Sequence, residues 1–383
     1  MVDKNKHSEK TINPSRRELA SVVPNGALGT VASSSVRSSS FVASNPSPNT
    51  PIIAMYPGLA EPSDEYLLFI RQIGLDTVMV MGLPEDLRSV EGLLSIRKRY
   101  ADAGINVYTI CGPISMQPKE IVLNMPGRDK LIEDYLNWIR TLGKAGIHYT
   151  NSGFMGGTGV WTTRRGGEAS TRGAATREFD DAASTVAPVS MPSFEVNRLA
   201  FGREYTREEI LENFTYFVRK VAPVAEEAGV CIGFHPDDPP GYQTMAGVAR
   251  IFSSFQSIRE ALQISNSPNI GIILCGGIWL EGGERMGADL TEAIRWFVAN
   301  KKTWEFHFRN VSSPLPRFLE TFPDNGYYDM YKAMEALVDV GYSGIVHLDH
   351  TPAMVGAPYA YAAYATGYMK ACLQRALAEA RSA

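Results

Sequence analysis

The chain has 383 residues, of which 44% are hydrophobic and 20% are charged, and its formal net charge is −4. This length suits one large domain or two small ones, and the weak negative charge gives no reason to expect nucleic acid or an anionic membrane as a partner. No apolar segment approaches the roughly 20 residues that a membrane-spanning helix needs. The four cysteines are scattered without a C-x-x-C pair, so a disulfide framework is not expected.

Residues 1–50 differ in composition from the rest of the chain. They are rich in Ser, Asn, Pro, Val and Ala, and Ser33–Ser40 is nearly a serine tract, so we expect a disordered or processed leader. Within it, Arg16 and Arg17 precede a mildly apolar stretch, as in a twin-arginine export signal, although a solvated tail can also carry paired arginines. We expect a cytoplasmic protein, with export in the folded state by the twin-arginine route as the alternative.

From residue 51 onward, short strand-like segments alternate with amphipathic helices, which predicts a parallel sheet. Eight such units closed on themselves make a (β/α)₈ barrel, which we expect to be a single catalytic domain over residues 51–383. A doubly wound open sheet is the alternative, but polar strand ends continue to the last strand instead of clustering at one switch point. The expected strands are Pro51–Tyr56, Asp76–Met81, Ile105–Cys111, Ile147–Met155, Val230–Phe234, Asn269–Gly276, Trp304–Val311 and Gly344–His350. The expected helices are Ser63–Ile73, Glu85–Ala103, Arg128–Ala145, Thr206–Ala228, Met245–Ile264, Asp289–Asn300, Tyr327–Val340 and Ala360–Ala380.

Residues 156–205 form an unusually long connection after the fourth strand. Connections of this length in a compact domain are usually lids, binding loops or disordered segments. Because this one leaves the end of the barrel that binds substrates, we expect a lid that contributes Trp161 and Arg164 to substrate binding. A mobile decoration or a dimer contact is the alternative. Rim loops of barrels often meet in dimers, so we also expect a homodimer.

Four successive strands deliver metal-binding side chains at or near their ends: His235, Cys275, His307 and Asp349. The carboxyl ends of barrel strands meet at one rim, so we expect these four side chains to lie together. Two imidazoles, one thiolate and one carboxylate suit a borderline-soft divalent ion with open coordination positions. The ligand types do not separate Mn²⁺, Fe²⁺, Co²⁺ and Zn²⁺. A metal-free polar cluster with Cys275 as a buried thiol is the alternative.

Further polar residues beside these four predict the reaction class. His350 follows Asp349, and an imidazole near its normal pKa suits acid or base catalysis at neutral pH. Tyr359 or Tyr361 is expected to be a second proton donor. This set fits elimination of water or an aldose–ketose isomerisation, because both begin with proton removal beside a carbonyl-type group. Four other polar residues beyond the strand ends are expected to contact the substrate: Asp237, Asp238, Arg309 and Asn310.

Six short motifs recur in the order of a known family. They are Trp161-Thr162-Thr163-Arg164, His235-Pro236-Asp237-Asp238-Pro239-Pro240, Leu274-Cys275-x-Gly277, His307-x-Arg309-Asn310, Gly326-x-x-Asp329-Met330 and Asp349-His350. From about Met55 to Leu373 the chain resembles the mannonate dehydratases of hexuronate breakdown, a branch of the xylose-isomerase-like barrels. The resemblance implies one Mn²⁺ or Fe²⁺ ion on the residues matching His235, Cys275, His307 and Asp349, and proton transfer by those matching His350 and Tyr359. It also implies a sugar-acid substrate, D-mannonate, which loses water to give 2-dehydro-3-deoxy-D-gluconate.

The chain departs from the family pattern near the expected substrate pocket. Leu319 and Pro323 stand where the family has histidines around Glu320, Thr351 replaces a glycine, and a family arginine near Tyr364 is missing. These departures keep two other interpretations open. One is a divalent-metal isomerase or epimerase acting on a neutral sugar or a modified glycoside, and the other is a non-catalytic sugar-binding barrel.

Overall fold

The computed structural model describes residues 49–112, 117–155, 160–166, 168–183, 185–188, 194–195, 198–350, 352–356 and 359–382. All of them belong to one compact unit, Ala43–Ala383. The expected leader with its paired arginines, apart from its last two residues, lies outside the described part of the chain. Within that part, no helix combines the length and the apolar character that crossing a lipid bilayer requires.

Parallel strands form a barrel, as the alternating pattern predicts. The strands pair in the orders β2-β3-β4 and β5-β11-β14-β15-β18-β1. Only Ala54 separates β1 from β2, and the Thr109 hydroxyl donates a 2.7 Å hydrogen bond to the Tyr149 carbonyl, which joins β4 to β5. The strands are β1 (Ile52–Ile53), β2 (Met55–Leu59), β3 (Thr77–Met81), β4 (Asn106–Ile110), β5 (Tyr149–Gly153), β11 (Cys231–His235), β14 (Ile270–Cys275), β15 (Thr303–His307) and β18 (Ile345–His347).

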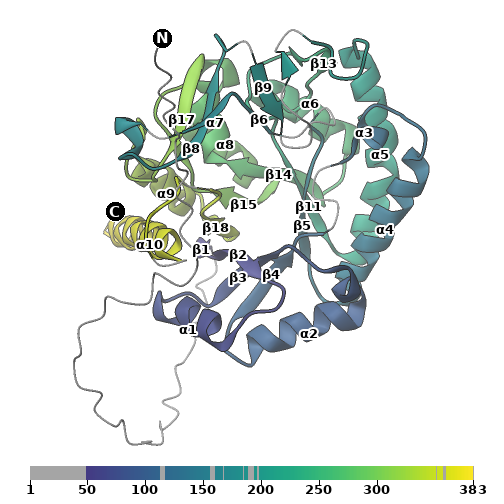
Figure 1. The fold of residues 1–383 in the computed structure, drawn as a ribbon. Coiled ribbons are helices and arrows are strands. Elements are labelled where there is room, and N and C mark those ends of the chain that lie inside the picture. Colours follow the sequence, from purple (N-terminus) through teal and green to yellow (C-terminus); the bar gives the residue numbers. More distant parts are fainter. Residues whose placement is uncertain are drawn as a thin grey trace, which may run out of the picture. The chain divides into compact units, whose positions relative to one another are not determined.

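Helices lie outside the ring of strands (Figure 1), and the core fills the space between the two layers. The capping box predicted at Thr206 is present, with hydrogen bonds in both directions between Thr206 and Glu209. The longer helices are α1 (Asp64–Gln72), α2 (Val90–Ala101), α4 (Arg128–Lys144), α5 (Arg207–Ala228), α6 (Phe255–Ser265), α8 (Leu290–Ala299), α9 (Met330–Asp339) and α10 (Ala360–Ala380). Shorter helical turns are η1 (Glu85–Leu87), α3 (Lys119–Val122), η2 (Ala169–Thr171), α7 (Gly276–Gly282) and η3 (Gly283–Met286).

The helix predicted from Met245 begins ten residues later than expected. The segment first forms a small hairpin of β12 (Thr244–Met245) and β13 (Val248–Ala249), and α6 then begins at Phe255. The backbone is left-handed at Ala246 and Gly247, with φ of 47° and 82°, which closes the hairpin and is incompatible with a continuing helix. Ser254 supplies the N-cap, so the helix begins where its first amide groups have a partner.

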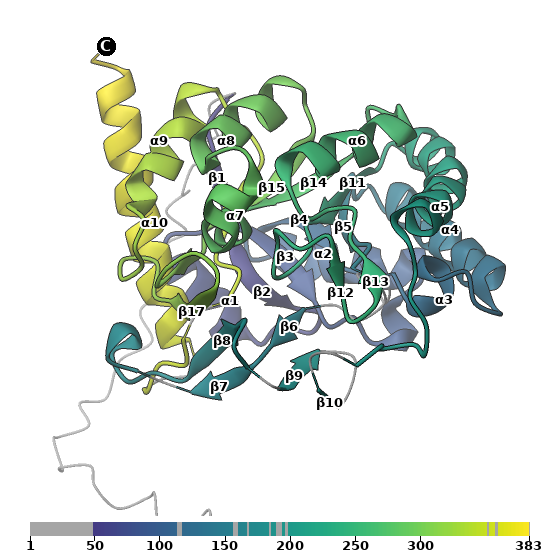
Figure 2. The ribbon, with the colours of Figure 1, turned by 90° about the horizontal axis from the view of Figure 1, so that it is seen from above.

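The long connection after β5 is built partly of strands. These are β6 (Trp161–Thr162), β7 (Arg164–Gly166), β8 (Thr176–Asp180), β9 (Thr185–Pro188) and β10 (Phe194–Glu195). β8 pairs antiparallel with β17 (Arg317–Thr321), which in turn pairs with β16 (Asn310–Val311). In Figure 2, β7 to β10 lie along one side of the barrel with β17 near β8. This connection, called the insertion below, is therefore attached through β8 to β17, in the segment that follows β15.

Candidate metal centre and active site

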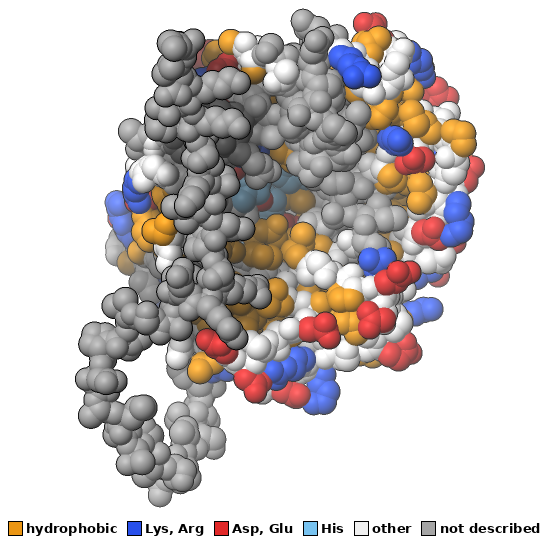
Figure 3. Space-filling view, in the orientation of Figure 1, with side chains coloured by type: hydrophobic (Ala, Val, Ile, Leu, Met, Phe, Trp, Pro, Cys, Tyr) orange, Lys and Arg blue, Asp and Glu red, His pale blue; other side chains and the backbone are white. Residues whose placement is uncertain are grey.

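The four predicted ligands come together at the carboxyl ends of β11, β14, β15 and β18. One ligand atom from each of His235, Cys275, His307 and Asp349 lies within 4.8 Å of the other three. All four residues are buried. Cys275 Sγ lies 3.9 Å from Asp349 Oδ2, and His307 Nδ1 lies 3.4 Å from the same oxygen. Figure 3 shows histidine side chains at the bottom of a hollow on the face turned to the viewer.

The hydrogen bonds of the two imidazoles leave one nitrogen of each ring available to a metal ion. His235 Nδ1 lies 2.7 Å from the Pro236 carbonyl, so this nitrogen carries the proton and Nε2 keeps its lone pair. His307 Nε2 lies 2.8 Å from Glu305 Oε1, while the buried Nδ1 has no hydrogen-bond partner among the described residues. A buried polar atom without a partner calls for an explanation. A divalent ion among these donors supplies one, so the residues present fit a metal site.

The charges around His235, Cys275, His307 and Asp349, called the quartet below, also suit a cation. Burial alone opposes ionisation, but the interactions of Asp349 with His350, His307 and Arg309 hold the pKa of its carboxyl group well below its ordinary value. Burial likewise opposes ionisation of Cys275, but the positive charge of Arg309 and the proximity of both imidazoles outweigh it and hold the pKa of this thiol well below its ordinary value. Thiolate and carboxylate are the forms that bind metal ions.

Arg309 is buried behind the quartet and contacts two of its members. Its Nε lies 3.0 Å from Asp349 Oδ2, and its Nη2 lies 3.4 Å from Cys275 Sγ. Its Nη1 donates to Glu281 Oε1 at 2.5 Å and to Glu320 Oε1 at 2.6 Å. Burial and the nearby carboxylates hold the pKa of Glu281 well above its ordinary value, although Arg309 opposes this. Arg309 is therefore placed to orient Asp349 and Cys275, and its own side chain is buried.

A second buried arginine, Arg177 of β8, brings the insertion into this network. It donates to both carboxylate oxygens of Asp238 at 2.8 and 3.0 Å, to Glu281 at 2.9 Å and to Glu320 at 2.7 Å. The roles of Arg177, Glu281 and Glu305 were not predicted from the sequence. The segment Thr176–Asp180 has a single apolar residue, Phe179, so nothing in the local sequence shows that it forms a strand whose arginine is buried.

His350 lies beside the quartet and is paired with Glu320. Its Nδ1 lies 2.8 Å from Glu320 Oε2, and its Nε2 lies 3.3 Å from Asp349 Oδ2. Burial lowers the pKa of His350, but Asp349 and Glu320 outweigh this effect and raise it above its ordinary value. The side chain is 44% exposed, so it is accessible to a bound substrate.

Most residues that we expected to touch the substrate are instead buried and paired inside the protein. Asp237 accepts a hydrogen bond from the Phe252 amide and pairs with Arg250, and the Asn310 amide donates to two backbone carbonyls. Asp238 and Arg309 belong to the network described above, and Trp161 is 2% exposed. In this structure such side chains support the site from behind, and the contact of these five residues with the substrate stays a prediction.

Two other predicted residues have different outcomes. The ring of Tyr359 packs against Phe69 and Tyr66 of α1, with centroid distances of 5.1 Å to each, so the structure does not bring it to the quartet. The side chain of Arg164 lies outside the described part of the protein, and its role stays a prediction. All four cysteines are free thiols, as expected.

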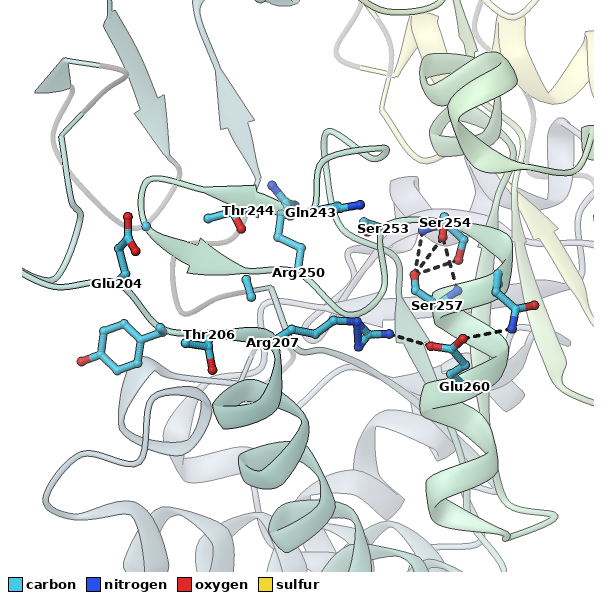
Figure 4. A pocket seen from close by; sticks show the side chains of 14 residues that line it. Glu204, Thr206, Arg207, Gln243, Thr244, Arg250, Ser253, Ser254, Ser257 and Glu260 are labelled. Carbon is cyan, nitrogen blue, oxygen red and sulfur yellow. Dashed lines mark hydrogen bonds and ion pairs between the residues drawn. The ribbon is translucent and has the colours of Figure 1, made fainter.

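A separate cavity of about 600 Å³ lies between the first turns of α5 and α6 (Figure 4). Arg207 pairs with Glu260 across it, and none of the quartet lines it. The capping boxes of both helices use their first amide groups, with Ser254 and Ser257 capping α6. The cavity therefore offers no ready anion site, and the rim of the barrel remains the candidate active site.

Known proteins with related sequences and folds identify the family and the fold of this chain. A sequence model described as D-mannonate dehydratase (UxuA) matches residues 66–378. Mannonate dehydratase of Thermotoga neapolitana is 29% identical over 285 residues, which cover 68% of this chain and 77% of that protein. Mannonate dehydratase from Streptococcus suis serotype 2 superposes with a TM-score of 0.73 at 21% identity, covering 86% of this chain and 96% of that one. An L-ribulose 3-epimerase superposes with a TM-score of 0.55 at 15% identity, covering 87% and 97%.

The two superpositions confirm the predicted barrel fold. The sequence match extends over most of the chain and confirms the family that the motifs predicted. Its members remove water from D-mannonate and are therefore hydro-lyases. The chain belongs to the D-mannonate dehydratase (UxuA) family.

Proposed function

We propose that this protein removes water from D-mannonate to give 2-dehydro-3-deoxy-D-gluconate, with one divalent ion held by His235, Cys275, His307 and Asp349. The observation that carries this proposal is the convergence of these four ligand atoms within 4.8 Å, in a chain whose family has this activity. The reaction belongs to the breakdown of hexuronates in this proposal.

We assign Mn²⁺ or Fe²⁺ to the quartet. A bound divalent ion would act as a Lewis acid toward the oxygen atoms next to the carbon that loses its proton. His235 would bind through Nε2 and His307 through Nδ1, because their other ring nitrogens face acceptors. The mixed nitrogen, sulfur and oxygen set does not suit Mg²⁺ or Ca²⁺, which prefer oxygen ligands alone.

His350 moves the proton in this proposal. Its Nδ1 donates to Glu320, which fixes the ring and leaves Nε2 to take the proton from the carbon beside the substrate carboxylate. The hydroxyl group on the next carbon leaves, and the proton on Nε2 passes to it to form water. The enol that remains tautomerises to the 2-oxo acid, with a proton lost from its oxygen and one gained by the carbon that carried the hydroxyl group. One imidazole therefore serves as base and then as acid, so no tyrosine at position 359 is needed.

The insertion is proposed to cover the substrate. It follows β5 at the carboxyl end of the barrel, and β8 pairs with β17, the strand that carries Glu320. Arg177 ties β8 to the same carboxylate that orients His350. The insertion and the proton-transfer pair are thus held by shared contacts.

The test is an assay of purified protein whose metal content has been measured by elemental analysis. Metal-free protein prepared with a chelator is assayed with D-mannonate alone, with Mn²⁺ and with Fe²⁺, and D-gluconate, the epimer at the reacting carbon, is the control substrate. We expect metal-dependent formation of a 2-oxo-3-deoxy acid from D-mannonate. Exchange of a substrate C–H with deuterated solvent without loss of water would instead indicate an epimerase. Absence of any metal-dependent turnover of aldonic acids would contradict the proposal.

A further inference from the structure

The buried carboxylate of Glu305 has no role in the mechanism above, and it contacts His307 of the proposed metal centre. Glu305 lies on β15 two residues before His307, so both side chains point into the barrel. The carboxylate is fully buried. Its Oε1 lies 2.8 Å from His307 Nε2 and 2.8 Å from His347 Nε2, and its Oε2 accepts a 2.7 Å hydrogen bond from the Tyr149 hydroxyl. Donors from three strands therefore converge on one side chain.

This arrangement decides which nitrogen of His307 carries the proton. An ionised carboxylate only accepts hydrogen bonds, so the proton lies on Nε2. The lone pair is then on Nδ1, which faces Asp349 at 3.4 Å and has no hydrogen-bond partner among the described residues. The opposite tautomer would direct the Nε2 lone pair at the carboxylate and the N–H into the quartet. His235 shows the reverse arrangement, since its Nδ1 is the nitrogen that faces an acceptor.

We propose that Glu305 is a positioning residue of the metal centre, which holds the His307 ring so that Nδ1 binds the ion. This inference rests on the proposed metal quartet, but not on the identity of the substrate. Carboxylates that accept from the far nitrogen of a metal-bound histidine fix its tautomer and orientation, and their loss typically lowers metal affinity or activity about 10–100-fold.

The test compares two variants, one that neutralises Glu305 and one that removes its hydrogen bond with Tyr149. Glu305→Gln keeps the size of the side chain but removes its charge and one acceptor. Tyr149→Phe is the matched control, because it removes the bond to Oε2 and leaves both histidine contacts in place. Each protein is stripped of metal, checked for folding by circular dichroism, and titrated with Mn²⁺ and Co²⁺ by calorimetry. The absorption spectrum of the Co²⁺ form reports the thiolate and the coordination number.

We expect Glu305→Gln to weaken binding of both ions about 10–100-fold and to change the Co²⁺ spectrum. Tyr149→Phe is expected to retain the affinity and the spectrum of the unaltered protein. Nitrogen NMR of the Zn²⁺-loaded protein should show the His307 proton on Nε2.

Equal affinities of the two variants, or a metal on Nε2 of His307, would overturn the inference. Absence of metal binding by the unaltered protein would overturn it together with the quartet. Normal metal binding without turnover of D-mannonate would contradict the proposed function alone.

Discussion

Replacing Arg177 with Met is expected to destabilise the protein strongly, because the arginine is buried among acidic groups. Its side chain is 6% exposed and contacts Asp238, Glu281 and Glu320 at 2.7–3.0 Å. Inside the network, the guanidinium groups of Arg177 and Arg309 both face the carboxylates of Asp238 and Glu320. Met keeps the unbranched stem of the side chain and removes the charge.

The magnitude follows from what remains after the substitution. Arg309 alone then faces both carboxylates, at 2.6 Å from Glu320 Oε1 and 3.6 Å from Asp238 Oδ2. Breaking a buried ion pair by removing one partner typically costs about 3–5 kcal/mol. Since one guanidinium group remains near both carboxylates, we expect the lower end, about 3 kcal/mol of the free energy of unfolding.

Arg317→Met provides the control. Arg317 also joins the insertion to the barrel, through Glu168 and Glu178, but its side chain is 43% exposed. Exposed ion pairs contribute about 0–1 kcal/mol. Urea unfolding of both variants, followed by fluorescence and by circular dichroism, measures the two losses. Equal losses for Arg177→Met and Arg317→Met would refute the argument that burial decides the value of these contacts.

Three further outcomes are expected. Cys275→Ser should lower the metal content in elemental analysis while the barrel stays folded, and full occupancy would remove Cys275 from the site. His350→Asn should retain the metal and lower kcat by about 10²–10⁴-fold, and unchanged turnover would refute its role in proton transfer. Burial raises the pKa of Glu320, but His350, Arg177 and Arg309 outweigh this and hold it well below the ordinary 4.5. The ionised Glu320 therefore stabilises the protein above about pH 4.5, and this contribution is lost as the pH falls. In urea unfolding between pH 3 and 7, Glu320→Gln should show a weaker loss of stability in acid than the unaltered protein.

The barrel and the convergence of the four proposed metal ligands were predictable because their signals are local. The sequence of a buried parallel strand such as Ile270–Cys275 is a continuous apolar run. The residue at its end, Cys275, is therefore predicted to lie at the rim of the barrel. Four such ends supplied the quartet without any knowledge of long-range contacts. The helix start at Phe255 was missed because the hairpin before it depends on two left-handed residues, Ala246 and Gly247, which the apolar pattern does not reveal.

The supporting side chains were not predictable, because charged residues are usually exposed and only distant partners allow them to be buried. Arg177 and Glu281 are 104 positions apart, and Glu305 meets Tyr149 across 156 positions. Gly277 illustrates the same limit. A Cβ atom there would lie 2.3 Å from Arg309 Nε, so the motif glycine is explained by a contact 32 residues away that the motif does not show.

Residues 317–325, where the sequence lacks the expected histidines, also bind the insertion, because β17 pairs with β8. Leu319 is buried and lies opposite Glu178 of β8, and the Pro323 carbonyl accepts a hydrogen bond from a buried side chain. The residue of this segment that contacts His350 is Glu320, and it is retained. Leu319 and Pro323, which stand where we expected histidines, therefore leave the contact between His350 and Glu320 in place. Because transition-state contacts set kcat and uniform binding contacts set KM, we expect any difference from the family to appear in KM across aldonic acids rather than as a loss of kcat.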